Sequence, residues 1–305
     1  MVQEKDKKEK KALPEEQEEM KEEPVASEEM EDDEPIAEDI KTEETDVVEN
    51  AVEPEEENVK AEKNEQEKIK DSWDPKTEVG RKVKSGEIVD IEYLLDNGRT
   101  ILEKEIVEVL VPNLQTDLLL IGQSKGKFGG GQRRVFKQTQ KKTREGNKPH
   151  FATYSVVGNG DGLVGIGYGK SKETVPAREK AIRNAKVNIF KINRGCGSWE
   201  CFCKDPHSIP YSVKGKCGSV EIELIPAPKG TGLKVEKECQ KILSMAGIKD
   251  VWSKTKGQTK TKINLVLACE EALRKLISTK VQPKHVKELG IIDGSSKASK
   301  EEDSE

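Results

Sequence analysis

Residues 150–168 read His150-Phe-Ala-Thr-Tyr-Ser-Val-Val157, Gly158-Asn-Gly-Asp-Gly162 and Leu163-Val-Gly-Ile-Gly-Tyr168. The first part alternates polar and apolar side chains, a pattern typical of a β-strand with one buried face. The glycines and the asparagine of the middle part tolerate the positive φ angles of a tight turn. The stretch therefore predicts an antiparallel hairpin, and the neighbouring segments extend it on both sides.

A third strand is predicted over Arg133–Thr139, joined to the hairpin by a loop over Lys141–Lys148. A helix is predicted from about Glu173 to Ile192, because Pro176 would fall in its first turn, where a missing N–H costs little. The side chains expected to face the sheet from this helix are Val175, Ile182, Ala185 and Ile189.

Helical spacing also precedes the strands. Ile91–Leu95 predicts a short helix that Asn97-Gly98 ends, and Thr100 could cap a second helix. The apolar face of the second helix would carry Leu102, Ile106, Val109 and Leu110. Leu118–Ile121 is either a strand or a helical turn. The predicted order is helix, three antiparallel strands, helix.

Beyond the irregular residues 193–216, a second unit is predicted. Its expected elements are a strand Ser219–Ile225, a loop Pro226–Gly232, a helix Val235–Ala246, a short strand Ile248–Trp252, a basic loop Ser253–Lys260 and a helix Thr261–Ile277.

Charge divides the chain into two parts of opposite sign. The net charge of −5 combines a head of 28 acidic and 11 basic residues (1–70) with a remainder of 42 basic and 30 acidic residues (71–305). The head has no aromatic residue and few branched apolar ones, so it is predicted to be disordered. Its acidity could compete with a polyanion for the basic body, or it could be a solvated tail without a partner, which we favour.

No apolar segment at the start predicts a signal peptide, and no run is long enough to span a bilayer. Six scattered cysteines in a chain rich in Lys and Glu favour a reducing cytoplasm, with thiols or a metal in place of disulfides. Cys217, Cys239 and Cys269 fall in strand or helix patterns and are predicted to be core thiols.

Basic residues on the Gly-rich scaffold between Lys125 and Arg194 indicate an RNA ligand, because phosphate contacts supply most nucleic-acid affinity. An ordinary solvated surface is the alternative. The predicted RNA contacts, with further positions in the second unit, are Lys125, Lys127, Arg133, Arg134, Lys137, Lys141, Lys142, Thr143, Arg144, Lys148, Lys170, Lys172, Lys180, Arg183, Lys186, Arg194, Lys214, Lys216 and Lys229.

Cys196, Cys201, Cys203 and His207 form a C-x4-C-x-C-x3-H cluster. Three thiolates and one imidazole would suit tetrahedral Zn²⁺. The spacing is irregular for a zinc ribbon, and Cys201 and Cys203 would point in opposite directions on an extended strand. These points favour the alternative of small buried thiols beside a loop histidine. Trp199 and Phe202 could stack on an unpaired base, although anchoring the loop in the core is the favoured role.

Several long motifs resemble the universal fifth protein of the small ribosomal subunit. They are Ser155–Lys170, Gly215–Gly232 and Met245–Gly257, while Arg194–Cys201 and Pro206–Pro210 are similar to its archaeal branch. The resemblance covers roughly Asp71 to Leu289. Because the motifs occur in the family's order, they are more specific than any single Gly-rich loop.

The resemblance implies an α+β fold of two domains. The first, over 71–215, would be a double-stranded-RNA-binding-like domain (α-β-β-β-α), and the second, over 216–292, a βαβα domain with a left-handed crossover. An acidic disordered extension (1–70) and a polar tail (293–305) would flank them. The segment Gln138–Lys148 matches the family's extended RNA-contacting loop.

The resemblance also implies a function. The chain would be a non-enzymatic constituent of the small ribosomal subunit that binds its rRNA, supports assembly, lines the region where mRNA enters and influences decoding accuracy. Small-subunit ribosomal proteins four and eight would be its protein neighbours, with no membrane and no small-molecule substrate. Arg133, Arg134 and Lys137 are the weaker candidates for contact with messenger.

Two other classes of protein remain open from the sequence. One is a double-stranded-RNA-binding protein that acts outside the ribosome. The other is a kinase-like enzyme, because some kinases share the second fold, but Leu233-Lys234-Val235 stands where they need a Ser-Ser-Ala run. A P-loop also fails, since Val164 occupies the position of its first glycine relative to Gly169-Lys170.

Overall fold

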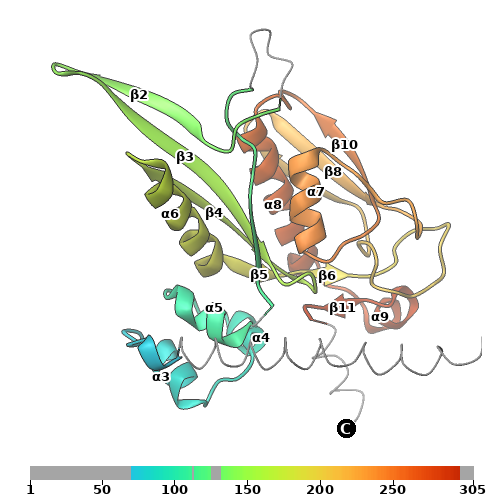
Figure 1. Cartoon of the computed structure of the whole chain (residues 1–305). Coiled ribbons are helices and arrows are strands. Elements are labelled where there is room, and N and C mark those ends of the chain that lie inside the picture. Colours follow the sequence, from blue (N-terminus) through green and yellow to red (C-terminus); the bar gives the residue numbers. More distant parts are fainter. Residues whose placement is uncertain (1–69, 112, 125–131, 296–305) are drawn as a thin grey trace, which may run out of the picture. The chain divides into compact units, whose positions relative to one another are not determined.

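The computed structural model describes residues 70–111, 113–124 and 132–295 (Figure 1). The chain divides into two compact units, 1–53 and 54–305, and every described residue belongs to the second. The predictions for nearly all of the acidic head, for Lys125 and Lys127, and for the tail beyond residue 295 lie outside the described residues. In the part of the chain that is described, no helix is long and apolar enough to cross a membrane.

The first sheet is built on the long strand β3 (Gly146–Gly158). It pairs antiparallel with β4 (Leu163–Ser171) along one edge, and along the other with β2 (Lys137–Thr143) and β1 (Gln115–Leu118), each beside one half of its length. β5 (Ile189–Lys191) extends the sheet beyond β4. The predicted hairpin is therefore confirmed.

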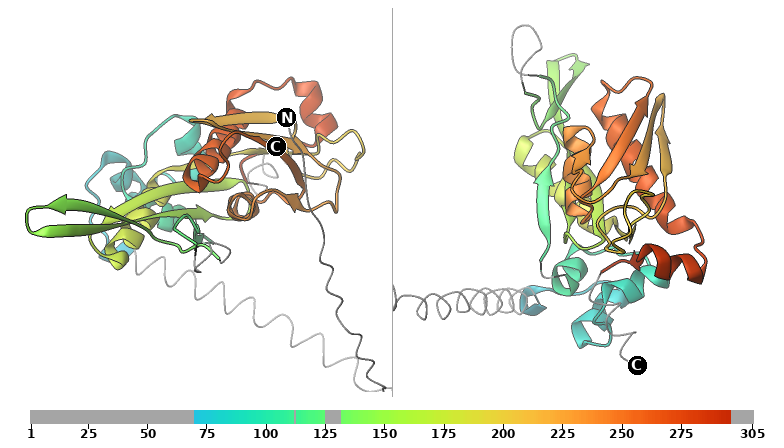
Figure 2. Two further views of the ribbon diagram at one scale, coloured as in Figure 1. Left: turned by 90° about the horizontal axis from the view of Figure 1, so that it is seen from above. Right: turned by 90° about the vertical axis from the view of Figure 1, so that its right-hand side faces the viewer.

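Helix α6 (Thr174–Val187) covers one face of this sheet, as Figure 2 shows. Its buried residues are Ala177, Ala181 and Ala185, and they meet the glycines of β4. A Cβ atom placed on Gly167 would lie 2.1 Å from the backbone nitrogen of Ala185, so glycine is required for this close approach. The predictions that Val175 faces the sheet and that Ile189 lies in the helix were wrong, because small residues make the contact and the helix ends at Val187.

The second sheet has the order β7–β8–β10–β9. Its strands are β7 (Val213–Cys217), β8 (Val220–Pro226), β9 (Leu233–Lys234) and β10 (Val251–Lys256). β9 and β10 are parallel, and α7 (Lys237–Met245) connects them. Helix α8 (Lys262–Ser278) packs against β7 and β8. The predicted strand Ile248–Trp252 begins and ends too early, because Ser253–Lys256 of the predicted basic loop continues the ladder with β8.

Three short helices precede the first sheet. They are α3 (Glu78–Ser85), which the sequence did not predict, α4 (Ile91–Asp96), which it did, and α5 (Lys104–Leu110). Thr100 does not cap α5: Glu103 is its N-cap residue, and Leu102 is 66% exposed. The N-cap side chain of Thr77 accepts a 3.1 Å bond from the Gly80 N–H and so begins α3.

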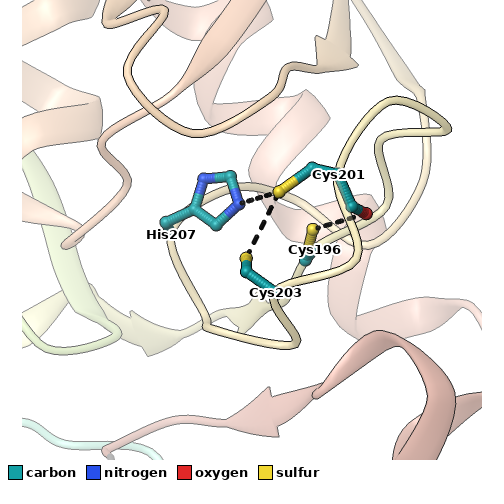
Figure 3. Close-up of side chains that lie close together, drawn as sticks. All are labelled: Cys196, Cys201, Cys203 and His207. Carbon is teal, nitrogen blue, oxygen red and sulfur yellow. Dashed lines mark hydrogen bonds between the residues drawn. The ribbon is translucent and has the colours of Figure 1, made fainter.

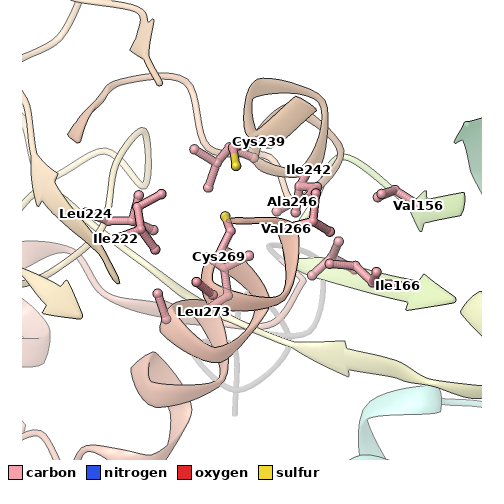
Figure 4. Close-up of a cluster of buried hydrophobic side chains, with 14 of the residues drawn as sticks. Val156, Ile166, Ile222, Leu224, Cys239, Ile242, Ala246, Val266, Cys269 and Leu273 are labelled. Atoms are coloured by element: carbon pink, nitrogen blue, oxygen red, sulfur yellow. The ribbon is translucent and has the colours of Figure 1, made fainter. Parts of the chain in front are cut away.

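One continuous core joins the two sheets. Val156 of β3 and Ile166 of β4 pack through Ile242 and Ala246 of α7 against the side chains of β8 and α8 (Figure 4). The predicted core thiols Cys239 and Cys269 are fully buried there, whereas Cys217 is half-buried. The division between two domains at residues 215 and 216 stays a prediction, and β7 already joins the second sheet from Val213.

The last described segment of the chain pairs with a strand that lies about one hundred residues earlier in the sequence. Helix α9 (Pro283–Leu289) is followed by β11 (Ile292–Asp293), which pairs antiparallel with β6 (Asn193–Arg194). This pairing brings the C-terminal segment against the start of the irregular residues 195–212. The loop that holds the cysteine cluster is therefore fixed between segments that are distant in sequence.

Candidate functional site

The residues predicted to form the loop Lys141–Lys148 form a β-ribbon instead. Lys141 pairs with Lys148 and Lys142 with Asn147, and Arg144 and Glu145 make the turn. The ribbon projects beyond the body of the protein (Figure 1). Both its faces are exposed, so its sequence lacks the apolar alternation from which a strand is predicted, and this is why the strand was placed too early.

Side chains alternate between the faces of a strand, so Lys141 and Lys142 point to opposite faces of the ribbon. Lys148 lies beside Lys141 and forms a 2.7 Å ion pair with Glu145. No other carboxylate among the described residues forms an ion pair with the cations of this ribbon. The Thr143 hydroxyl donates a 2.7 Å bond to the Gly146 carbonyl and stabilises the turn. The tip therefore presents positive charge in two directions.

Most of the other predicted contacts in the first unit are exposed. Arg133 is half-buried, and its guanidinium donates to the carbonyl oxygens of Gly122 and Lys260. The exposed positions are Arg134, Lys137, Lys170, Lys172, Lys180 and Arg183. They are open to a ligand, and their contact with RNA stays a prediction.

Two of the predicted RNA-contacting residues form ion pairs with carboxylates inside the fold. The Lys186 ammonium lies 2.7 Å from Glu108, and both side chains are largely buried. Arg194 is 5% exposed and donates to Asp161 and to the carbonyl oxygen of Gly294. Because these cations are bound by carboxylates within the fold, they are not available to RNA phosphates.

The outer face of the second sheet carries two rows of alternating charge. Lys214 of β7 lies beside Glu223 of β8, and Lys216 beside Glu221, with ion-pair distances of 3.3 Å and 2.8 Å. On the other side of β8, these glutamates lie opposite two lysines of β10, Lys254 and Lys256, which were not among the predicted contacts. The hydrogen bond from Lys216 lowers the pKa of the Glu221 carboxyl.

A shallow groove runs along this face, lined by these lysines and by Lys275 of α8. The alternation of Lys254 and Lys256 on one strand is the signal that would have revealed them, had β10 been predicted at its full length. Lys229, predicted as an exposed contact, forms a 2.8 Å ion pair with Asp205.

The four residues of the predicted metal cluster converge in the structure (Figure 3). The sulfur atoms of Cys196, Cys201 and Cys203 and a ring nitrogen of His207 all lie within 4.8 Å of one another. The Cys201 sulfur is 3.4 Å from that of Cys203 and 3.8 Å from Nε2 of His207. The expectation that Cys201 and Cys203 diverge was wrong, because residues 201–205 are not a strand.

Two features bend the loop that carries the cluster. Lys204 has a φ of 58°, the left-handed region that turns the chain sharply. At the base of the loop, Gly195 and Ser208 exchange backbone hydrogen bonds of 3.0 Å and 3.1 Å. Cys196 and His207, which are eleven positions apart in the sequence, are therefore held side by side.

The imidazole of His207 is oriented by a buried carboxylate. Its Nδ1 lies 2.8 Å from Oδ2 of Asp250, and both residues are about 5% exposed or less. Oδ1 of Asp250 accepts a 2.8 Å bond from the Gly232 N–H. The carboxylate is placed to accept a proton from Nδ1, and in the neutral tautomer with that proton the electron pair of Nε2 faces the sulfur atoms.

The three thiols differ in their surroundings. The backbone N–H of Lys229 lowers the pKa of the Cys201 thiol to about 6, whereas burial raises the pKa of Cys196 to about 11. In the same loop, the rings of Trp199 and Phe202 are 80% and 89% exposed to solvent. The prediction that these two aromatic residues anchor the loop in the core was wrong.

Comparisons with known proteins identify both halves of the described region. A family profile for "Ribosomal protein S5, N-terminal domain" matches residues 132–193, and one for "Ribosomal protein S5, C-terminal domain" matches residues 215–285. The first match covers β2 to β5 of the first sheet with α6, and the second covers the second sheet from within β7, with α7 and α8.

Similar full-length proteins carry the name small ribosomal subunit protein uS5. The chain is 49% identical to that of Nanoarchaeum equitans over 74% of its own length and 96% of the relative's. It is 48% identical to that of Methanocaldococcus jannaschii, over 73% and 96% of the two chains. For Pyrobaculum arsenaticum the identity is 45%, over 66% and 93%. With identity this high over nearly the whole length of these relatives, the chain belongs to the ribosomal protein S5 family, a family of structural, non-enzymatic proteins.

Proposed function

We propose that the chain is a structural RNA-binding protein of the small ribosomal subunit and that the β2–β3 ribbon is its main RNA contact. The observation that carries this proposal is the exposure of Lys141, Lys142 and Arg144 on a ribbon whose single ion pair in the described residues joins Lys148 to Glu145. Among the described residues, these three side chains form no ion pair with a carboxylate. Phosphate oxygens are suitable ligands for such cations.

The two-sided charge of the ribbon favours insertion between RNA segments. A protein surface that lies on one RNA helix needs cations on one face only. Here Lys141 with Lys148 serves one face and Lys142 serves the other, so phosphates from two directions can be bound at once. The ribbon would hold two rRNA segments at a fixed separation, which is a contribution to assembly that requires no chemistry.

The exposed cations of β4 and α6 extend this surface. Lys170 and Lys172 lie at the end of β4, and Lys180 and Arg183 lie on the solvent side of α6. Strand β1 joins the sheet in addition to the three predicted strands, so the order is α5-β1-β2-β3-β4-α6. The antiparallel strands β2–β4 with α6 support a likeness to double-stranded-RNA-binding domains, in which a helix and the adjoining sheet follow an RNA backbone. For the second domain, we also propose the left-handed crossover that the family resemblance implies.

The family's roles follow as further proposals. The chain would support small-subunit assembly, line the region where mRNA enters, and influence decoding accuracy from the cytoplasmic ribosome. Exposed Arg134 and Lys137 at the base of the ribbon are the candidates for messenger contact, by phosphate pairing. Neighbouring small-subunit proteins four and eight would be its protein partners.

The test uses the full chain and two RNAs of equal length, one from the small-subunit rRNA and one from the large-subunit rRNA. Binding is measured by filter retention across a salt series, and crosslinked positions are mapped by mass spectrometry. We expect preference for the small-subunit RNA and crosslinks within Lys137–Lys148. Equal affinity for both RNAs, or crosslinks that avoid the ribbon, would contradict the proposal.

A double-stranded-RNA-binding protein that acts outside the ribosome is the second candidate, because the likeness to double-stranded-RNA-binding domains suits it equally. Sedimentation of cell extracts at high salt distinguishes the two. A chain that stays with small subunits is a ribosomal constituent, and one found only in the light fractions is not.

A further inference from the structure

We infer that Cys196, Cys201, Cys203 and His207 bind one Zn²⁺ ion, which closes the loop 196–207 as a structural clasp. The ion would be held by three thiolates and one imidazole, a donor set that is common in structural zinc sites. This site is independent of the RNA contacts proposed for the β2–β3 ribbon.

The distances between the donor atoms fit a tetrahedral ion. With Zn–S bonds of about 2.3 Å and a Zn–N bond of about 2.0 Å, tetrahedral donors lie about 3.5–3.8 Å apart. The measured separations from the Cys201 sulfur are 3.4 Å to Cys203 and 3.8 Å to His207, and every donor pair lies within 4.8 Å. Small side-chain rotations would therefore complete the shell without moving the backbone.

Asp250 supplies the outer partner that zinc-binding histidines have. Zinc-bound imidazoles donate their other N–H to a carboxylate or a carbonyl, which fixes the tautomer and raises the basicity of the ligating nitrogen. In the structure Nδ1 of His207 lies 2.8 Å from a carboxylate that is itself fixed by the Gly232 N–H. A buried histidine that merely packs in a core does not need its second nitrogen to face three sulfur atoms.

The alternative of small buried thiols does not fit the positions. Buried structural cysteines such as Cys239 and Cys269 lie in helices among apolar side chains. Cys201 and Cys203 lie instead in an irregular loop and are partly exposed. Their sulfur atoms lie 3.4 Å apart in a loop without regular structure, next to the left-handed residue Lys204, and an ion bound by both would hold this arrangement in place.

The clasp would unite three parts of the chain. The loop is joined to α9 because the Cys196 N–H donates a 2.8 Å bond to the Leu289 carbonyl. It is joined to the start of β10 through His207, whose carbonyl oxygen accepts from the N–H groups of Lys249 and Asp250. Binding one ion would thus tie the connection between the two sheets to the C-terminal helix, and it would fix the exposed rings of Trp199 and Phe202.

The first experiment measures metal in the full chain purified under reducing conditions. We expect one zinc per chain by elemental analysis and negligible iron. Replacement by Co²⁺ should give the visible d–d absorption of a tetrahedral site with thiolate-to-cobalt charge transfer. Zinc well below one per chain after incubation with ZnCl₂, stoichiometric iron, or an octahedral cobalt spectrum would each overturn the inference.

Variants then assign the site. Cys203→Ser should lose the bound zinc and the tetrahedral cobalt spectrum, while Cys217→Ser, which removes a half-buried thiol outside the cluster, should keep both. Equal zinc content in the two variants would place the metal elsewhere and refute the site.

A second pair of variants preserves all four ligands, so it is informative even if Cys203→Ser does not fold. In Asp250→Asn, the amide would donate to Nδ1 and force the proton onto Nε2, the nitrogen that must bind the metal. We expect zinc affinity, measured by competition with a chromophoric chelator, to fall about 10- to 100-fold. Asp205→Asn, which changes an exposed carboxylate in the same loop, should retain wild-type affinity. Unchanged affinity in Asp250→Asn would contradict the role of His207.

Discussion

Two lysine-rich surfaces of this protein differ in what surrounds their charges. On the β2–β3 ribbon, the only ion pair among the described residues joins Lys148 to Glu145. On the outer face of the second sheet, Glu221 and Glu223 of the central strand β8 each lie between a lysine of β7 and a lysine of β10. The ribbon is uncovered on both faces, whereas the second sheet is covered on one face by α8.

The difference shows that the number of basic residues in a segment does not give its available charge. A lysine beside a carboxylate must give up that contact before it binds phosphate, and the carboxylate repels the incoming anion. Of the ribbon lysines in the described residues, only Lys148 has a carboxylate partner, so Lys141 and Lys142 give up no ion pair when they bind phosphate. We therefore expect the ribbon to dominate RNA affinity and the sheet face to contribute weakly, although both contain several lysines.

The largest effect is expected when the ribbon loses its tip cations. Lys142→Ala combined with Arg144→Ala should weaken binding to small-subunit rRNA and lower the slope of log affinity against log salt by about two units, one for each phosphate contact. The measurement is a salt titration of RNA binding by filter retention. An unchanged slope would move these residues off the interface.

The matched control removes the same charge elsewhere. Arg81→Ala combined with Arg99→Ala changes two exposed arginines of the N-terminal helical region. It should leave the slope nearly unchanged, and circular dichroism should show both double variants folded. If both pairs lower the slope equally, net charge and not position controls the affinity, and the contrast between the surfaces would fail.

A smaller effect of opposite sign is expected on the sheet face. Glu221→Gln combined with Glu223→Gln keeps the size of the side chains but releases the neighbouring lysines and removes the repulsion of phosphate. Binding to RNA of any sequence should become stronger, with a slope increased by about one unit.

Glu78→Gln combined with Glu105→Gln is the control for this change, because these glutamates also pair with lysines but lie on α3 and α5. An equal gain in the control would mean that overall charge explains the result. No gain in the sheet variant would show that its lysines are not accessible to RNA even when they are released.

The sequence predicted the elements that have one buried and one exposed face. Helices α4 and α8 were found because helical spacing records which side faces the core. The hairpin at Gly158–Gly162 was found from its apolar strands and its glycine-rich turn, although the strands are buried on both faces beside the turn. The ribbon was missed because both of its faces are polar and exposed. The second half of β10, Ser253–Lys256, was missed because all of its side chains are polar. Helix α6 was oriented wrongly because glycine and alanine form its contact, and small residues carry little periodic signal.

The sequence predicted which residues form the candidate metal site, but it did not predict how they are arranged in space. The spacing of the cysteine cluster suggested zinc but also an extended strand that would separate Cys201 from Cys203. The left-handed turn at Lys204 and the carboxylate of Asp250, distant in sequence, could not be foreseen from spacing. Likewise, the internal ion pairs of Lys186 and Arg194 depend on Glu108 and Asp161, which the fold brings near.

The smallest effect is expected when the β7 lysines are removed. Lys214→Ala combined with Lys216→Ala deletes two exposed cations, as the ribbon variant does, but each of these already has a glutamate partner. We expect the salt slope to fall by about half a unit or less, since little phosphate binding is lost. The released glutamates would account for part of any loss in affinity by repelling RNA. A fall as large as that of the ribbon variant would show that paired lysines bind RNA as well as unpaired ones, and would break the distinction between the two surfaces.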